Sequence, residues 1–216
     1  MTFKANDSLT EQIARYLGKQ IIQNDMHAGE RIQELRIAAE LDVSRGSVRE
    51  ALLLLERRHL VNIYPRRGAV VAELGAESAD EFFDLWFALI ERVVVTFCQT
   101  WDNEELAPFF DISTQLMEAQ QHDDLEAYYD SSVALLSALY PLGRNRYLEQ
   151  TLDDLLPLTQ RCFYAVLKSG KTQMAMTNQL VDATLKAVTA RDVERVRKAI
   201  ADFSAAYRHI IAEALQ

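Results

Sequence analysis

Hydrophobic residues in the first quarter of the chain recur at the spacing of two short helices joined by a tight turn. Those of the first helix are Leu35, Ala38, Ala39 and Leu41, and those of the second are Val48, Leu52 and Leu55. Apolar residues that follow one another at intervals of three and four share a helix face, so the two helices can pack through these faces at a steep angle. The pattern therefore predicts a helix-turn-helix.

The turn between the two helices contains a start signal for the second one. In the segment Asp42-Val43-Ser44, the Ser44 hydroxyl can accept a backbone hydrogen bond as an N-cap, so we expect the second helix to begin near Arg45. In helix-turn-helix proteins the first turns of this helix enter the major groove, where arginine can bond guanine or clamp a phosphate. The residues available there are Arg45, Gly46, Ser47 and Arg49.

A short hairpin is predicted directly after the second helix. Residues 61–64 and 69–71 are rich in β-branched and aromatic side chains, and Pro65-Arg66-Arg67-Gly68 between them is typical of a turn with two cations at its tip. Each piece also has a simpler interpretation, two packed core helices or a solvated hairpin. Together they indicate a winged helix-turn-helix.

The rest of the chain shows helical periodicity throughout. The expected helices span residues 77–99, 103–121, 123–139, 147–168, 171–189 and 192–215. Seven glycines and four prolines in 216 residues leave little room for a loop-rich enzyme. We therefore expect a mainly α protein, with a DNA-binding domain at residues 1–74 and a bundle of about six helices at residues 75–216.

Charge is distributed unevenly between these two parts. Residues 1–72 hold 11 Lys and Arg against 9 Asp and Glu, whereas residues 73–216 hold 12 against 23, a net charge of −11. Six arginines lie between Arg45 and Arg67. An acidic protein with one basic segment orients that segment toward DNA, because its acidic remainder is repelled.

No signal peptide or membrane-spanning segment is evident, and Cys98 and Cys162 lie inside apolar helical patterns. We expect buried free thiols and a reducing cytoplasm. The alternative function is an enzyme that uses the winged helix as a targeting module. No nucleophile–base pair or phosphate-binding glycine loop supports it, so we expect no catalytic residues.

The N-terminal motifs together resemble the GntR family of bacterial regulators. They are Ala28-Gly29-Glu30-Arg31-Ile32, Val43-Ser44-Arg45, Val48-Arg49-Glu50-Ala51-Leu52 and the wing sequence from Pro65 to Val71. The resemblance implies a dimer on a pseudo-palindromic operator, with Arg45 and Arg49 on DNA and Gly68 against the minor groove. The family commonly has Thr-Pro where this chain has Gly46-Ser47. The candidate DNA-binding residues are Arg36, Ser44, Arg45, Ser47, Arg49, Arg66, Arg67 and Gly68.

The helical part resembles the effector-binding FCD domain of the FadR-like branch. This resemblance rests on residues 85–91, on Asp123-Asp124-Leu125 with Asp130, on Gly143-Arg144-Asn145 and on the Leu185-Lys186-Ala187-Val188 segment. Many members of the branch hold a metal with one Asp and three His. Asp130 matches the aspartate, but the positions expected to be histidine fall at Ala134, Val181 and Phe203. We therefore expect no metal and no cofactor.

The same substitutions predict an apolar effector pocket. Phe87 stands where the branch often has an arginine, so the pocket could accept a fatty acid or an acyl thioester, or it could be filled by core side chains. Arg161 could hold an anionic head group if it points inward, although a surface position is the expected alternative. The predicted pocket residues are Phe87, Asp130, Ala134, Arg161, Tyr164, Val181 and Phe203. With a filled pocket, the protein would be a DNA-binding regulator controlled by a partner or by its abundance.

Overall fold

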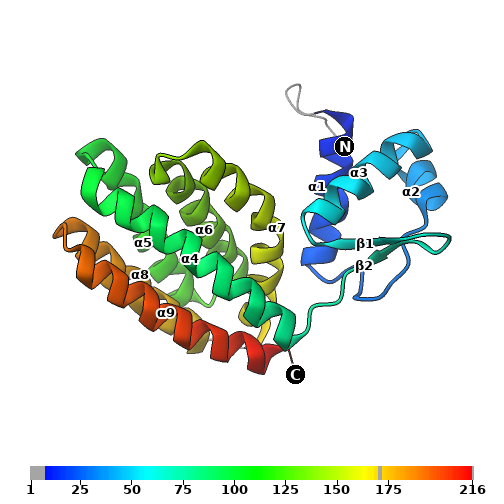
Figure 1. Cartoon of the computed structure of the whole chain (residues 1–216). Helices are drawn as coiled ribbons and strands as arrows, with labels where there is room; N and C mark the ends of the chain where they lie inside the picture. Colours follow the sequence, from blue (N-terminus) through cyan, green and yellow to red (C-terminus); the bar gives the residue numbers. More distant parts are fainter. Residues whose placement is uncertain (1–7, 170–171, 216) are drawn as a thin grey trace. The chain divides into compact units, whose positions relative to one another are not determined.

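A computed structural model describes residues 8–169 and 172–215 of the chain (Figure 1). These residues divide into two compact units. The first comprises the segments Met1–Leu74 and Asp154–Arg161, and the second comprises Gly75–Asp153 and Cys162–Gln216. The predicted fold class is confirmed, because a small winged helix-turn-helix precedes an all-helical bundle.

The first unit contains three helices and a two-stranded antiparallel sheet. The elements are α1 (Leu9–Ile22), α2 (Glu34–Leu41), α3 (Arg45–Arg57), β1 (Val61–Tyr64) and β2 (Gly68–Val71). Val61 pairs with Val71 and Tyr64 with Gly68, so the predicted hairpin is present. The segment before α2 pairs with the outer side of β2, because Ile32 N–H donates to the Ala69 carbonyl at 2.9 Å.

The core of this unit lies where α3 packs against α1 and α2. Val48, Leu52 and Leu55 are buried on α3, as the spacing predicted. The predicted face of α2 is wrong. Leu35 is 69% exposed, whereas Ile37 is 2% exposed and is the buried residue of this helix. In a helix of only eight residues several apolar faces fit the spacing, and packing against α3 selects among them.

Six α-helices and a 3₁₀ turn make up the described residues of the second unit, except that residues 154–161 of α7 belong to the first unit. They are α4 (Ala76–Thr100), α5 (Asn103–His122), α6 (Leu125–Leu139), η1 (Tyr140–Gly143), α7 (Arg146–Ser169), α8 (Thr172–Thr189) and α9 (Val193–Ala214). Each predicted helix is present, and its ends differ from the prediction by at most two residues. Pro108 and Pro157 lie inside α5 and α7.

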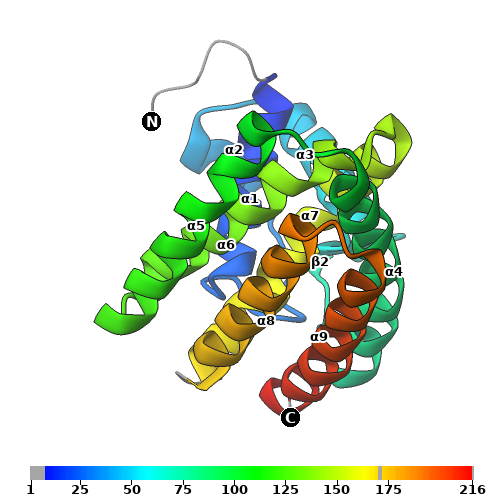
Figure 2. The same ribbon diagram turned by 90° about the vertical axis from the view of Figure 1, so that its left-hand side faces the viewer.

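Helices α4 and α9 form a long antiparallel pair, and α8 lies beside them (Figure 2). The Arg208 guanidinium reaches Asp80 at one end of the pair, at 2.5 Å from Nε to Oδ1, and Arg197 pairs with Glu91 farther along. At the end of α4, Arg191 donates to the Trp101 carbonyl at 2.8 Å and its guanidinium lies 4.2 Å from the Trp101 ring centroid. These contacts fix the ends of the pair.

A partly buried polar network joins α8 to α5 and α6. The Tyr128 hydroxyl lies 2.9 Å from Oδ1 of Asn178, and the Asn178 amide nitrogen donates to Gln120 Oε1 at 2.6 Å. Burial raises the pKa of the Tyr128 phenol, so the hydroxyl stays protonated. Cys98 and Cys162 are buried and form no disulfide, as predicted.

Candidate functional site

The first turn of α3 is fixed by its N-cap. Ser44 Oγ accepts from the backbone N–H of Ser47 at 3.0 Å, and the two serine hydroxyls are 2.9 Å apart. This confirms Ser44 as the N-cap and Arg45 as the first residue of the helix. Both hydroxyls are therefore already engaged, and their main effect is to set where α3 begins.

The two arginines of α3 are held differently. Arg45 donates from Nε to Oε2 of Glu34 at 2.7 Å, although its side chain is 62% exposed. Arg49 is exposed one turn later and makes no ion pair within residues 8–169 and 172–215. Glu34 therefore orients one guanidinium at the start of α3, and the next is left to solvent.

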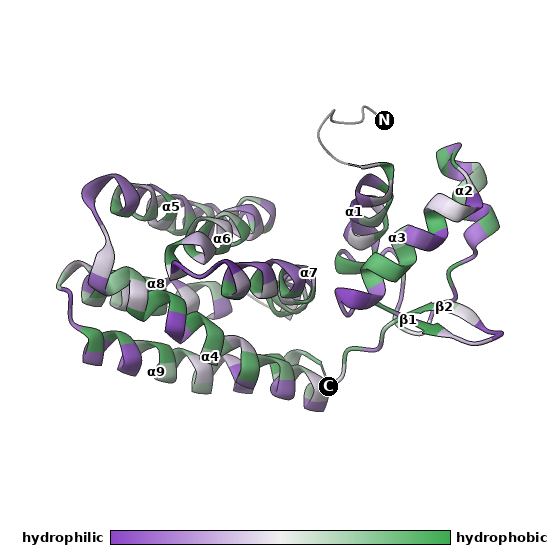
Figure 3. Ribbon diagram, turned by 45° about the horizontal axis from the view of Figure 1, so that its top comes forward, coloured by the Kyte–Doolittle hydropathy of each residue, from purple (hydrophilic) through white to green (hydrophobic). Residues whose placement is uncertain are grey.

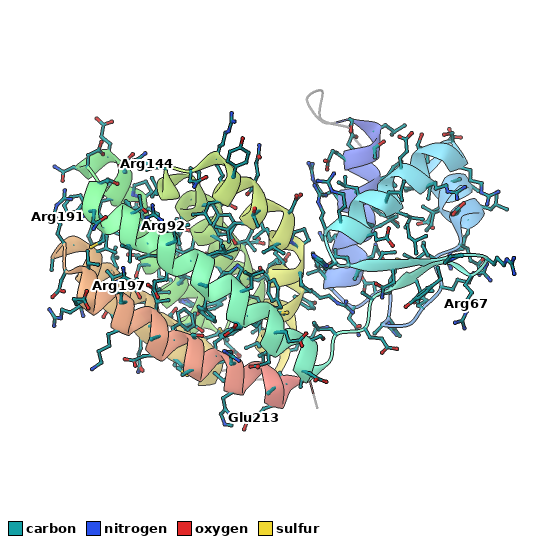
Figure 4. The ribbon with its side chains drawn as sticks, viewed as in Figure 1. Arg67, Arg92, Arg144, Arg191, Arg197 and Glu213 are labelled. Atoms are coloured by element: carbon teal, nitrogen blue, oxygen red, sulfur yellow. The ribbon has the colours of Figure 1, made fainter. Side chains whose placement is uncertain are left out.

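The hairpin presents its cations at its tip. Arg66 and Arg67 are exposed, and Arg67 extends beyond the strands in Figure 4, while the loop colours as hydrophilic in Figure 3. Gly68 has a φ of 80°, a left-handed conformation that favours glycine, and a Cβ there would meet nothing closer than the Arg31 guanidinium at 3.9 Å. Backbone conformation, not crowding within the free protein, is what requires glycine at this position.

A groove of about 710 Å³ lies between α3 and the wing. Four arginines line it, with Glu34 as the single acidic residue: Arg31, Arg45, Arg49 and Arg66. Gly68 also lines it, whereas Arg36, Ser44, Ser47 and Arg67 lie outside the lining. The structure thus brings together four of the eight residues that the sequence predicted. A concave surface with these cations suits a phosphate backbone and adjacent base edges.

Arg31 and Tyr64 are two residues of the groove that were not among the predicted DNA-binding residues. Arg31 reaches it because its backbone bridges to Val70 of β2, and Tyr64 reaches it from the end of β1. The pairing of residue 31 with β2 has no periodic signal in the sequence. Only the position of Arg31 directly before buried Ile32 hints that its side chain points outward.

The helical unit contains a partly open cavity of about 90 Å³ between α4, α5, α6, α8 and α9. None of the lining residues that the structure describes carries a charge. They are Trp86, Phe87, Ile90, Val94, Phe97, Phe109, Leu135, Leu136, Leu139, Val181, Thr184, Leu185, Val188, Ile200 and Phe203. Three of the predicted pocket residues, Phe87, Val181 and Phe203, are among them.

The other four predicted pocket residues are elsewhere. Asp130 and Ala134 are both exposed, because they share a face of α6 that is turned away from the bundle. The buried positions of α6 include Ser132 and Leu136, which share the opposite face. Asp130 and Ala134 therefore do not line this cavity, whose α6 residues are Leu135, Leu136 and Leu139.

Arg161 and Tyr164 also lie outside the cavity. The expected surface position of Arg161 is wrong: this side chain is buried, and Nη1 donates to the Ala72 carbonyl at 2.8 Å within the first unit. Tyr164 is half-buried, packs edge-on against Tyr129 and lies 4.6 Å below the Lys168 ammonium.

Within the described residues, no group of three or more His, Cys, Asp or Glu side chains is placed to hold a metal ion. In the same part of the chain, no helix combines the length and hydropathy that a membrane span needs. The candidate functional sites are thus two: a basic groove in the first unit and an uncharged cavity in the second unit.

Two family models match this chain. One, described as bacterial regulatory proteins of the gntR family, matches residues 9–71, and the other, the FCD domain, matches residues 81–206. The transcriptional regulator YdhC of Bacillus subtilis is 29% identical over 158 residues, which is 70% of this chain and 68% of YdhC. The gluconate operon transcriptional repressor of the same organism is 25% identical over 69% of this chain and 61% of its own length.

The regulator McbR of Escherichia coli is similar in both sequence and structure. It is 25% identical over 148 residues, 68% of this chain and 67% of McbR. Its solved structure covers 97% of this chain and 100% of its own, with a TM-score of 0.82 at 21% identity. A solved regulator from Rhodococcus gives a TM-score of 0.71 over 93% of this chain and 98% of its own. These structures share the fold.

Proposed function

Because this chain belongs to the GntR family of bacterial transcriptional regulators and carries an FCD domain, we propose that it binds a pseudo-palindromic operator as a dimer. In this proposal residues 1–74 read DNA and residues 75–216 dimerise and bind an effector. The observation that carries it is the basic groove between α3 and the wing. Two symmetric half-sites are the natural target of two such units.

Within the groove we assign Arg45 and Arg49 to base edges and phosphates at the start of α3. Arg66, Arg67 and Arg31 would act on the DNA backbone around the wing. Arg36 lies on α2, outside the groove lining, and would reach at most a flanking phosphate. Ser44 and Ser47 would act mainly by placing the helix start, since their hydroxyls already bond within the turn.

The helical unit would bias DNA binding through its cavity. An effector that fits one conformation of the bundle better than another shifts the population between them. The lining is apolar and contains no cation to pair with a carboxylate. A fatty acid or an acyl thioester is too large for a cavity with a volume of about 90 Å³. A compact apolar effector therefore fits the cavity better. Repression is the mode named for the gluconate operon relative, and we propose it here.

In vitro selection of duplexes from a random library by the purified full chain tests this proposal. We expect an enriched motif made of two inverted half-sites, and mass photometry should show two chains per selected duplex. An absence of any enriched motif would count against sequence-specific binding. A single, asymmetric half-site bound by one chain would contradict the dimer.

A further inference from the structure

Leu35 is a large apolar side chain that the fold leaves in solvent. It is 69% exposed, the highest value among the large hydrophobic side chains in the described part of the chain. It lies in the first turn of α2, the helix whose buried position is taken by Ile37. Single exposed leucines are common on protein surfaces, so the surroundings of Leu35 decide whether it has a function.

The surroundings of Leu35 are those of the basic groove. Its side chain lines this groove together with four arginines, and Arg45 is one of them. Glu34, the preceding residue, accepts a hydrogen bond from Nε of Arg45 at 2.7 Å, so the first turn of α2 is joined to the first residue of α3. Leu35 therefore belongs to the end of the groove where α3 begins.

The groove combines its cations with exposed apolar side chains. Nine large hydrophobic residues are exposed in the described part of the chain, and three of them line this groove: Leu35, Leu53 and Tyr64. Leu53 follows Arg45 by eight residues, which is about 12 Å along α3, and Tyr64 lies at the end of β1. Of the three, Leu35 is the one that the Glu34 contact joins to Arg45.

The major groove of DNA offers an apolar group to such a surface. Thymine presents its C5 methyl group there, whereas guanine presents the acceptors N7 and O6 that arginine binds. Phosphates are bound by cations and hydrogen-bond donors, so a leucine adds nothing to their binding. Resting on the proposed binding of DNA in this groove, we propose that Leu35 contacts the C5 methyl group of a thymine beside the site that Arg45 binds. Leu35 then selects thymine at one position of each half-site.

Deoxyuracil gives a direct test, because it differs from thymine only by the missing methyl group. In a duplex selected by the wild-type chain, the thymines of one half-site should be replaced by deoxyuracil one at a time. Fluorescence anisotropy then measures the affinity of each duplex. At one position the replacement should weaken binding about fourfold, which corresponds to the ~0.8 kcal/mol of one buried methyl group.

Variants of the protein assign the lost methyl contact to a side chain. Leu35→Ala should bind the thymine and deoxyuracil duplexes equally well at that position, because the leucine that contacts the methyl group is gone. Leu35→Met keeps an apolar side chain of similar volume and should keep most of the preference for thymine. The matched control is Leu53→Ala, which removes an exposed leucine from the same groove and should leave the preference in place.

The thymine contact is overturned if no position shows a loss of affinity that Leu35→Ala removes. It is also overturned if Leu35→Ala weakens the thymine and deoxyuracil duplexes by the same factor, because that result describes a contact with deoxyribose. Either result, in a wild type that does select a duplex, rejects the thymine contact alone and retains the proposed function. A wild type that selects no duplex rejects the proposed function and the thymine contact with it.

Discussion

Ser44 and Arg45 show how single residues fix the start of α3, the helix that we propose to enter DNA. The Ser44 hydroxyl is used by the helix cap, and the Arg45 guanidinium is oriented by Glu34. Arg49, one turn later, has no partner in the described part of the chain and is the cation most available to a base edge. The sequence allowed the cap and the helix start to be predicted, because both depend on residues within one turn.

His59 has a left-handed backbone conformation, which is unfavourable for a residue that carries a Cβ atom. It follows α3 with a φ of 58°, where helices usually end in glycine, and its side chain is exposed. His59→Gly should raise the free energy of unfolding of the first unit by about 0.5 to 1 kcal/mol, because glycine reaches this conformation without a Cβ clash. Urea unfolding followed by circular dichroism measures the change.

The control for this substitution is His209→Gly inside α9, five residues before the end of the helix. His209 is equally exposed but helical, so glycine there should destabilise the protein by about 1 kcal/mol. The two substitutions are therefore expected to have opposite signs. A loss of stability in both would show that the left-handed conformation at His59 carries no strain.

The wing, the hairpin formed by β1 and β2, carries Arg66 and Arg67 at its exposed tip. We expect Arg66→Ala or Arg67→Ala to reduce the dependence of log affinity on log salt by about one unit of slope, because each removes one phosphate contact. Arg195→Ala removes an exposed cation of α9 and should leave the slope unchanged. Anisotropy titrations at several salt concentrations measure this. An unaltered slope in the wing variants would place these residues off the DNA.

The α4–α9 pair predicts a specific dependence of stability on pH. The hydrogen bond from Arg208 lowers the pKa of Asp80 below its ordinary value of 3.8. The stabilisation is therefore complete above the unfolded-state pKa and is lost as pH falls through the lowered folded-state pKa. Asp80→Asn should remove this part of the acid dependence.

Thermal midpoints measured from about pH 6 down to about pH 2.5 test the Asp80 prediction. The wild type should lose stability more steeply than Asp80→Asn at the acid end of this range. Asp111→Asn, at an exposed position of α5, serves as the control and should follow the wild type. If the thermal midpoint of Asp80→Asn falls with pH as steeply as that of the wild type, then the Asp80–Arg208 pair does not contribute to the pH dependence of the free energy of unfolding.

At the element scale, long helices were predictable and faces of short ones were not. The 25-residue α4 repeats its apolar positions often enough to define its buried side, although Leu85 on it is 53% exposed. In α2 the same reasoning chose Leu35 over Ile37. In α6 the family resemblance pointed to the face of Asp130, because the aspartate matched by type, while burial selects the face of Ser132.

At the scale of the whole molecule, the division of charge agrees with the division into units. The basic groove lies in the first unit, and the acidic helical part contains an uncharged, partly open cavity. Composition was sufficient to predict that division. The family resemblance pointed to Phe87, Val181 and Phe203 of the cavity lining, but the rest of the lining was not predictable, because it comes from five helices and depends on how each helix is rotated.

The central claim is that the groove between α3 and the wing binds DNA, and one titration tests it most directly. Fluorescence anisotropy should be measured on a duplex selected by the wild-type chain, with wild type, Arg49→Ala and the control Arg195→Ala. Loss of a base or phosphate contact at Arg49 should weaken binding by about 1 to 3 kcal/mol, roughly 5- to 150-fold, while the control binds like the wild type. Equal affinity of Arg49→Ala and wild type would contradict the assignment of this groove to DNA.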